Sequence, residues 1–282
     1  MVFLLSLLPM FGWGINNVLV GRLGRRVGFL KTAVSVQLLA WVVFLGWWLV
    51  RGDAFGEIKW STFMLLGLLA AGNYGLMLKA LASGQAGVVT AIVAASSLVT
   101  ATLGIAFLGE SVSSFKVISV GVIFLGLVGV SFDWKLIGKR SSFKWANGVP
   151  AAILASLGFG FYFFFLGPVN RLHGWFMTTL ILRGLTGLNL LILWWFMVGS
   201  REVKRPIPWR TLLPIILIEL VGFTGYNFAV TKYEVSYVYT IANASPIVSL
   251  TVARIFFKEK VAWYKLISVA VIIGGIVGMQ WG

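Results

Sequence analysis

The sequence predicts an all-α membrane protein with ten transmembrane helices, built as two inverted five-helix repeats. Three observations predict it. Apolar residues make up 59% of the 282 positions and charged residues only 11%, whereas about a quarter of a typical soluble domain is charged. The apolar residues come in blocks of about 20, the length of a helix that crosses the hydrocarbon core of a bilayer. Finally, the second part of the chain repeats the first.

The predicted helices follow the apolar blocks, and most charges lie between the blocks. The blocks are about twice as long as a barrel strand and do not alternate polar with apolar residues, which favours helices. The first block has no basic region before it and no small-residue cleavage site, so we expect it to stay as a span. The ten predicted helices are residues 2–20, 30–50, 60–81, 86–108, 113–132, 146–168, 174–199, 208–231, 236–257 and 262–281.

The boundaries within the first half follow local signals. The first block stops before Arg22 and the second before Arg51. The third begins at Trp60, after a charged loop. The fourth and fifth are separated by a short hairpin that contains Glu110. We expect Glu110 to cap the next helix and to pair with the nearby lysine rather than to bind substrate.

The five blocks of the second half follow in the same order, at an offset of 149 residues. Trp60 recurs as Trp209, and Arg22 and Leu23 recur as Arg171 and Leu172 without a gap. The hairpins and last helices of the two halves pair Glu110 with Glu259, Lys116 with Lys265, Ile118 with Ile267, Ser119 with Ser268, Gly126 with Gly275 and Gly129 with Gly278. Five spans per half is an odd number, so the second copy enters the membrane from the opposite side. Such inverted repeats are typical of secondary transporters. The predicted domains are a first repeat at 1–133, a basic linker at 134–145 and a second repeat at 146–282.

The distribution of charged residues along the chain indicates what the protein binds and how it is oriented in the membrane. The formal net charge is +15, but the basic residues flank the apolar blocks, which favours anchoring at a membrane surface over nucleic-acid binding. The loops after the odd-numbered spans hold most of them, so the positive-inside rule puts both termini outside the cytoplasm. The predicted location is the inner (plasma) membrane, as a multi-pass protein.

Enzyme chemistry finds little support in the sequence. The absence of cysteine excludes disulfides and thiolate sites, and no P-loop, GxSxG or HExxH motif occurs. We therefore predict no catalytic residues, no metal and no cofactor.

Charged groups inside the predicted spans identify a candidate site. Of the eight acidic residues, only Glu219 lies away from loops and helix ends, roughly 15 Å into its helix. Arg183 lies at a similar depth in the preceding helix. Two interpretations stay open: a structural ion pair, or a site for substrate or protons.

Polar and aromatic residues near the middle of several other spans favour a central cavity. Each alone could be a helix–helix contact, but together they predict a substrate site. We expect Pro246 to free the carbonyl of Ala242, and Arg183 and Pro246 to have structural or coupling roles. The glycines Gly121, Gly126, Gly129, Gly274, Gly275 and Gly278 are predicted to allow close helix packing. The predicted cavity residues are Trp13, Asn16, Asn17, Asn73, Tyr74, Phe159, Tyr162, Glu219, Tyr226, Asn227, Tyr239 and Asn243.

Several motifs resemble the EamA-type branch of the drug/metabolite transporter superfamily. They are WGINN (13–17), FLGES (107–111), NASP (243–246) and FFKEK (256–260), together with Arg183 and the five-plus-five repeat. The resemblance covers the whole chain. It implies a ten-helix carrier whose cavity is lined mainly by the spans at 2–20, 60–81, 86–108, 146–168, 208–231 and 236–257.

The sequence also departs from that resemblance. Val34 stands in the first half where the second has Arg183, and Ser97 where the second has Pro246. The first span lacks the membrane carboxylate of the related small multidrug resistance proteins, so their proton-exchange scheme is not carried over. Members of the family usually have both termini inside, contrary to the charge distribution.

The sequence thus favours a secondary transporter that moves a small organic metabolite, amino-acid-like or amphipathic, outward by alternating access. The alternatives are a lipid flippase or scramblase-like protein or a non-transporting membrane subunit, and, third, a membrane enzyme. A polar cavity closed to lipid would favour the carrier, and a polar furrow between helices would favour lipid handling. The expected partners are the substrate and the bilayer. Proton coupling stays open, as does the choice between a monomer and a homodimer.

Overall fold

The structure, a computed structural model, describes residues 2–52, 56–108, 113–131, 147–197, 206–233 and 235–278, and these ranges contain helices and no strand. Seven helical segments of the described residues are long and apolar enough to cross a membrane, and one of them, Ala86–Gly104, runs across the break at Ala95. Ser245–Phe257 and Trp263–Gly278 are shorter apolar helices. The all-helical fold is confirmed, and the count of ten spans stays a prediction. Glu110, Lys116's side chain and the linker 134–145 lie outside what the structure describes.

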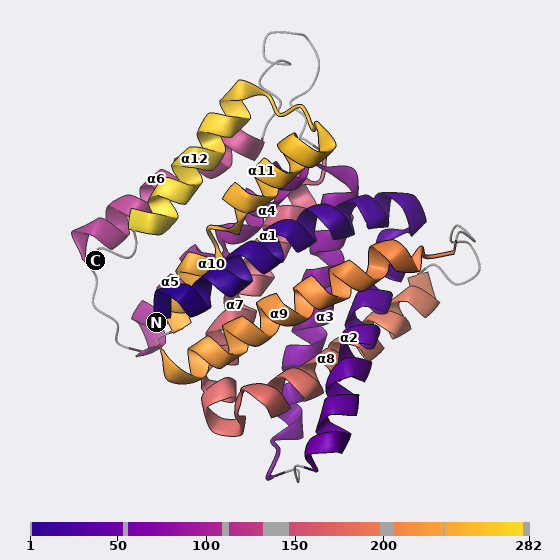
Figure 1. The fold of residues 1–282 in the computed structure, drawn as a ribbon. Helices are drawn as coiled ribbons and strands as arrows, with labels where there is room; N and C mark the ends of the chain where they lie inside the picture. The colour runs from indigo at the N-terminus through magenta and orange to yellow at the C-terminus, as the bar shows by residue number, and fades with distance from the viewer. Residues whose placement is uncertain are drawn as a thin grey trace.

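Twelve helices are described, and Figure 1 shows their arrangement. Those of the first half are α1 (Val2–Val27), α2 (Phe29–Arg51), α3 (Trp60–Ser83), α4 (Ala86–Ala94), α5 (Ser96–Leu108) and α6 (Ser114–Ser131). Those of the second half are α7 (Val149–His173), α8 (Trp175–Met197), α9 (Trp209–Lys232), α10 (Val235–Ala242), α11 (Ser245–Phe257) and α12 (Trp263–Gly278).

Two helices run further than their charges suggested. The predicted ends at residues 20 and 168 were wrong, because α1 continues to Val27 and α7 to His173. Basic residues in a last turn stabilise the negative end of the helix dipole, so they do not stop a helix. Each helix ends instead at a glycine with positive φ, Gly28 (100°) after α1 and Gly174 (76°) after α7. Glycine adopts such angles without the steric cost that a Cβ brings.

The ungapped alignment of the two halves was wrong for their first two helices. Gly28 and Gly174 are 146 residues apart, as are the starts of α2 and α8, whereas the starts of α3 and α9 are 149 apart. The chain therefore holds three more residues between the starts of α8 and α9 than between the starts of α2 and α3. As a result, Arg183 corresponds to Gln37 rather than to Val34.

Hydrogen bonds follow the same two offsets. Ser249 Oγ of α11 donates to the carbonyl of Gly14 in α1 (2.8 Å). Thr100 Oγ1 of α5 donates to the carbonyl of Gly160 in α7 (3.0 Å). Gly14 and Gly160 are 146 residues apart, and Thr100 and Ser249 are 149 apart. The α1–α11 crossing and the α7–α5 crossing therefore have the same local construction.

The segments 86–108 and 236–257 were each predicted as one helix, and each is two helices. The breaks fall at Ala95 and at Asn243–Ala244, and Ala95 and Ala244 are 149 residues apart. The first break contains no proline, so proline is not required for it. Pro246 lies in the first turn of α11, where its missing N–H loses no helical hydrogen bond. Pro246 therefore does not interrupt a continuous helix, and the free carbonyl of Ala242 stays a prediction.

Close packing between α6 and α12 confirms four of the six glycine predictions. A Cβ on Gly126 would lie 2.7 Å from Ile272, and one on Gly275 would lie 2.5 Å from Ile123. Gly129 and Gly278 face serines of the opposite helix at similarly short range. Gly121 and Gly274 have no atom within 4 Å of a built Cβ, so the packing prediction was wrong for those two.

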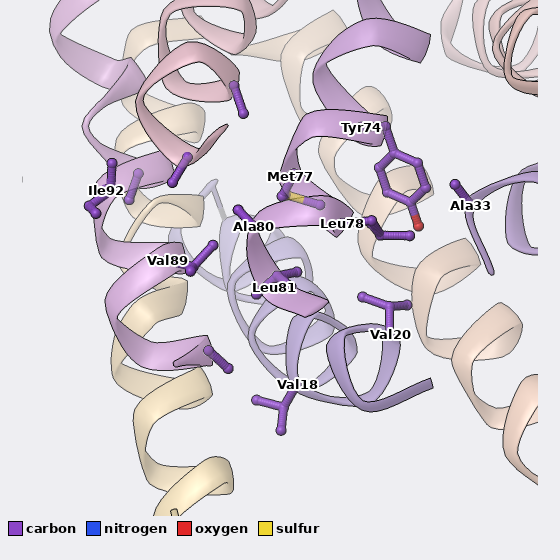
Figure 2. Close-up of a cluster of buried hydrophobic side chains, with 14 of the residues drawn as sticks. Val18, Val20, Ala33, Tyr74, Met77, Leu78, Ala80, Leu81, Val89 and Ile92 are labelled. Carbon is purple, nitrogen blue, oxygen red and sulfur yellow. The ribbon is translucent and has the colours of Figure 1, made fainter. Parts of the chain in front are cut away.

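The largest apolar cluster surrounds the second half of α1. Figure 2 shows Val18 and Val20 of α1 near Leu78 and Leu81 of α3 and Val89 of α4. α1 also packs along α9 and against α11 and α10. This central position brings residues 13–17, in the middle of α1, into the interior of the bundle.

Candidate functional site

A cavity of about 100 Å³ lies within the bundle, lined by residues of α1, α2, α3, α4, α7, α8, α9, α10 and α11. The lining has residues from every predicted span that the family resemblance named, and it also has residues from α2 and α8. The lining holds eight of the predicted cavity residues, from both halves of the chain. They are Trp13, Asn17, Tyr74, Phe159, Tyr162, Glu219, Tyr239 and Asn243.

The other four predicted residues are buried but are not part of the lining. Asn227 joins three helices, because its Nδ2 donates to Thr179 Oγ1 (2.7 Å) and its Oδ1 accepts from Asn170 Nδ2 (3.1 Å). Asn73 faces Gly158 of α7. Tyr226 packs against Trp13, with ring centroids 5.5 Å apart. Asn16 donates a hydrogen bond to Glu219, which does line the cavity. Tyr226 and Asn227 therefore lie outside the cavity lining, because α9 is buried on more than one face.

Glu219 and Arg183 form an ion pair at the cavity wall. Arg183 Nη1 lies 3.0 Å from Glu219 Oε1, and the two side chains are 2% and 7% exposed. Asn16 Nδ2 donates to Glu219 Oε2 at 2.7 Å. Both carboxylate oxygens are therefore held, one by a charge and one by an amide. A charge buried at this depth needs such partners to offset its lost hydration.

Arg183 is held on two further sides. Its Nη1 also donates to Gln37 Oε1 (2.8 Å), and its guanidinium carbon lies 4.2 Å from the centre of the Phe223 ring. Stacking on a ring is a favourable arrangement for a guanidinium. Gln37 was missed from the sequence because the alignment placed Val34 opposite Arg183; an offset of 146 would have found it.

Aromatic rings form another part of the wall. Phe163 of α7 lies 5.6 Å from Trp13, 5.1 Å from Tyr226 and 4.2 Å from Tyr239, measured between ring centroids. The Tyr239 hydroxyl is hydrogen-bonded to the Ser96 hydroxyl, at the start of α5. This cluster packs α1, α7, α9 and α10 together and ties α10 to the break between α4 and α5.

Several small polar residues of the lining gave no sequence signal. Thr90 donates to the carbonyl of Ala86 in its own helix (2.8 Å), as hydroxyls within helices commonly do, so nothing separates it from an ordinary helix residue. Thr186 and Ser245 also line the cavity. Phe163 and Phe223 were among the many aromatic residues whose direction the sequence left undefined.

The site can bind a small polar molecule. It presents two opposite charges, amides and hydroxyls within an aromatic enclosure, the usual make-up of small-molecule sites. Among the described residues, no group of three or more His, Cys, Asp or Glu is placed to hold a metal ion.

Comparisons with known proteins agree with this architecture. A solved structure described only as "Crystal structure of protein" aligns with a TM-score of 0.71 at 15% identity, covering 99% of this chain and 97% of the other. That similarity shows a shared fold. No curated protein is significantly similar in sequence. The sequence model of the EamA-like transporter family matches residues 1–132 and 146–281. The two matches leave only the centre and the last residue of the chain uncovered, and the chain belongs to the EamA-like transporter family.

Proposed function

We propose that this membrane transporter is a secondary carrier that moves a small organic metabolite, amino-acid-like or amphipathic, outward by alternating access. The observation that carries the proposal is the cavity with the Arg183–Glu219 pair at its wall. A pair of charges this deep in a predicted span has a high cost, and in membrane proteins such residues usually mark a transport pathway.

Burial argues against lipid handling. Arg183 and Glu219 are 2% and 5% exposed as whole residues, so neither faces the lipid side of the bundle. A scramblase needs a polar furrow that a headgroup can enter from the membrane. A cavity whose charged residues are buried among the helices instead suits a solute that enters from the aqueous phase.

The mechanism we propose rests on two inverted repeats, residues 1–133 and 146–282, joined by the linker 134–145. Three observations support it: the matched hydrogen bonds to Gly14 and Gly160, the breaks at Ala95 and Ala244, and the glycines Gly28 and Gly174. In inverted-repeat carriers, substrate sites lie near broken helices at the repeat interface, and one repeat rocks against the other. Here both breaks lie next to the cavity.

The orientation we propose follows the basic residues and puts both termini outside. Arg25 at the end of α1 pairs with Glu259 after α11 (3.6 Å). The basic residues at the end of α1 and those that follow α11 therefore lie at the same end of the bundle. A reporter that is active only in the cytoplasm, fused to the C-terminus, should then stay silent. A strong cytoplasmic signal would reverse the orientation and leave the cavity argument unchanged.

Glu219 is the residue we propose to couple transport to protons. The test is transport by purified protein in liposomes, with a metabolite mixture inside and an imposed pH gradient. Glu219→Gln should abolish gradient-driven transport, and Glu57→Gln, at an exposed loop position, is the matched control. Gradient dependence that survives in Glu219→Gln would leave the residue with a structural role alone. Lipid movement without solute transport would favour the scramblase-like alternative.

A further inference from the structure

One edge of the Arg183 guanidinium has no hydrogen-bond partner, and this edge indicates which chemical group the substrate carries. Its Nη1 is engaged by both Glu219 and Gln37. Its Nε and Nη2 are buried and have no hydrogen-bond partner among the described residues. These two nitrogens lie on the same edge of the planar guanidinium, so their N–H bonds run parallel. That edge is a fork that matches the two oxygens of a carboxylate.

This fork is held in place by contacts on its other sides. Nη1 is fixed by two acceptors, and Phe223 covers one face of the guanidinium. Arg183 therefore cannot turn to satisfy its free edge without breaking the ion pair. Buried N–H groups without partners are rare in native proteins and costly. A bound acceptor would remove that cost.

Glu219 does not offer an equivalent opening. One of its oxygens faces Arg183 and the other accepts from Asn16, so each already has a donor. The other unpaired polar atoms at the cavity lining, Asn243 Nδ2 and the Tyr74 hydroxyl, can both donate hydrogen bonds. The free capacity of the site is therefore mainly that of donors, which suits an anion.

We infer that the Nε–Nη2 edge of Arg183 binds a carboxylate of the transported molecule. The inference rests on the proposed carrier function and specifies its substrate class as small carboxylate compounds, whose remaining part packs against Trp13 and Phe163. Arg183 and Glu219 together carry no net charge, so a cation on the substrate or a proton would balance the added anion.

The experiment compares matched acids and amides. Purified wild-type protein in detergent would be tested for thermal stabilisation by a panel of small aliphatic and aromatic carboxylates, with and without an amino group, and by the primary amide of each. We expect stabilisation by carboxylates only, with an affinity at least about tenfold above that of the matched amide, because an amide leaves the fork partly unpaired. Stabilisation by amides as strong as by acids, or by no carboxylate in the panel, would overturn the inference.

Two variants separate this role from a structural one. Arg183→Lys keeps the positive charge beside Glu219 but lacks the fork, so the protein should fold while its preference for acids over amides is lost. Arg51→Lys is the matched control, because Arg51 also stacks on a phenylalanine, Phe176 (4.6 Å), but lies at the exposed end of α2. An acid preference retained in Arg183→Lys would assign the carboxylate to another group. If Arg183→Lys does not fold, Phe223→Leu takes its place, and a preference unchanged in that variant would count against the inference.

The same panel in liposomes keeps the two proposals apart. Carboxylates that bind through Arg183 and are not transported would contradict the carrier function and leave the binding site standing. Neutral compounds transported as well as acids would support the carrier and overturn the carboxylate inference.

Discussion

The two halves of the chain line one cavity, and at equivalent positions of the two repeats they place residues of different chemistry. Positions 70 and 219 are 149 apart and both line it, one as alanine and the other as glutamate. Positions 37 and 183 are 146 apart, both line it, and hold glutamine and arginine that bond to each other. The framework is therefore repeated, whereas both charges come from the second half.

This difference separates the features that helix packing requires in both halves from the features found in one half only. Glycines at tight crossings occur in both halves, because the same helix crossing needs the same small residues. A second ion pair would add two more buried charges with their own cost. The cavity holds one such pair, and at the equivalent positions the first half has Ala70 and Gln37.

The largest expected effect comes from replacing the two charged residues that only the second half contributes to the cavity. Glu219→Ala leaves Arg183 as an unpaired buried charge, so we expect it to lower the free energy of unfolding by about 3–5 kcal/mol. Adding Arg183→Gln gives the second half the residues of the first, and should recover much of that loss while transport is abolished. Thermal unfolding in detergent and transport in liposomes are the measurements. A single variant as stable as the double one would show that the pair does not hold the bundle together.

A smaller effect tests whether the halves pack alike. Gly126→Ala and Gly275→Ala each place a Cβ against the opposite helix of the α6–α12 crossing. Overpacking of this kind costs about 1–3 kcal/mol, and we expect similar losses from the two variants in thermal unfolding. Gly121→Ala and Gly274→Ala, which face open space, are the controls and should be neutral. Unequal losses at Gly126 and Gly275 would break the equivalence of the two helices.

The smallest effect concerns the aromatic wall, which the halves do not share. Tyr239→Phe removes the hydrogen bond to Ser96, for an expected loss of about 1 kcal/mol. The position 149 residues earlier is Thr90, whose hydroxyl bonds within its own helix, so Thr90→Val should cost less. Thermal unfolding of both variants measures the difference. A greater loss at Thr90 would contradict the proposed link between α10 and α5.

The sequence by itself determined the all-helical membrane class and the family, and it predicted how far Glu219 and Arg183 lie along their helices. These follow from hydropathy and from distance along a helix, which are local properties of the chain. Five of the six aromatic residues predicted for the cavity also line it in the structure.

Only the tertiary structure decided which way each side chain points and which partner it meets. A helix that is apolar nearly all round gives no signal of its rotation in the bundle. The sequence therefore could not show that Asn16 and Asn227 lie outside the cavity lining, whereas Asn17 is part of it. The breaks at Ala95 and Ala244 and the pairing of Gln37 with Arg183 depend on contacts between distant helices. Such contacts are set by packing, because the surfaces of the helices fit together in only a few ways.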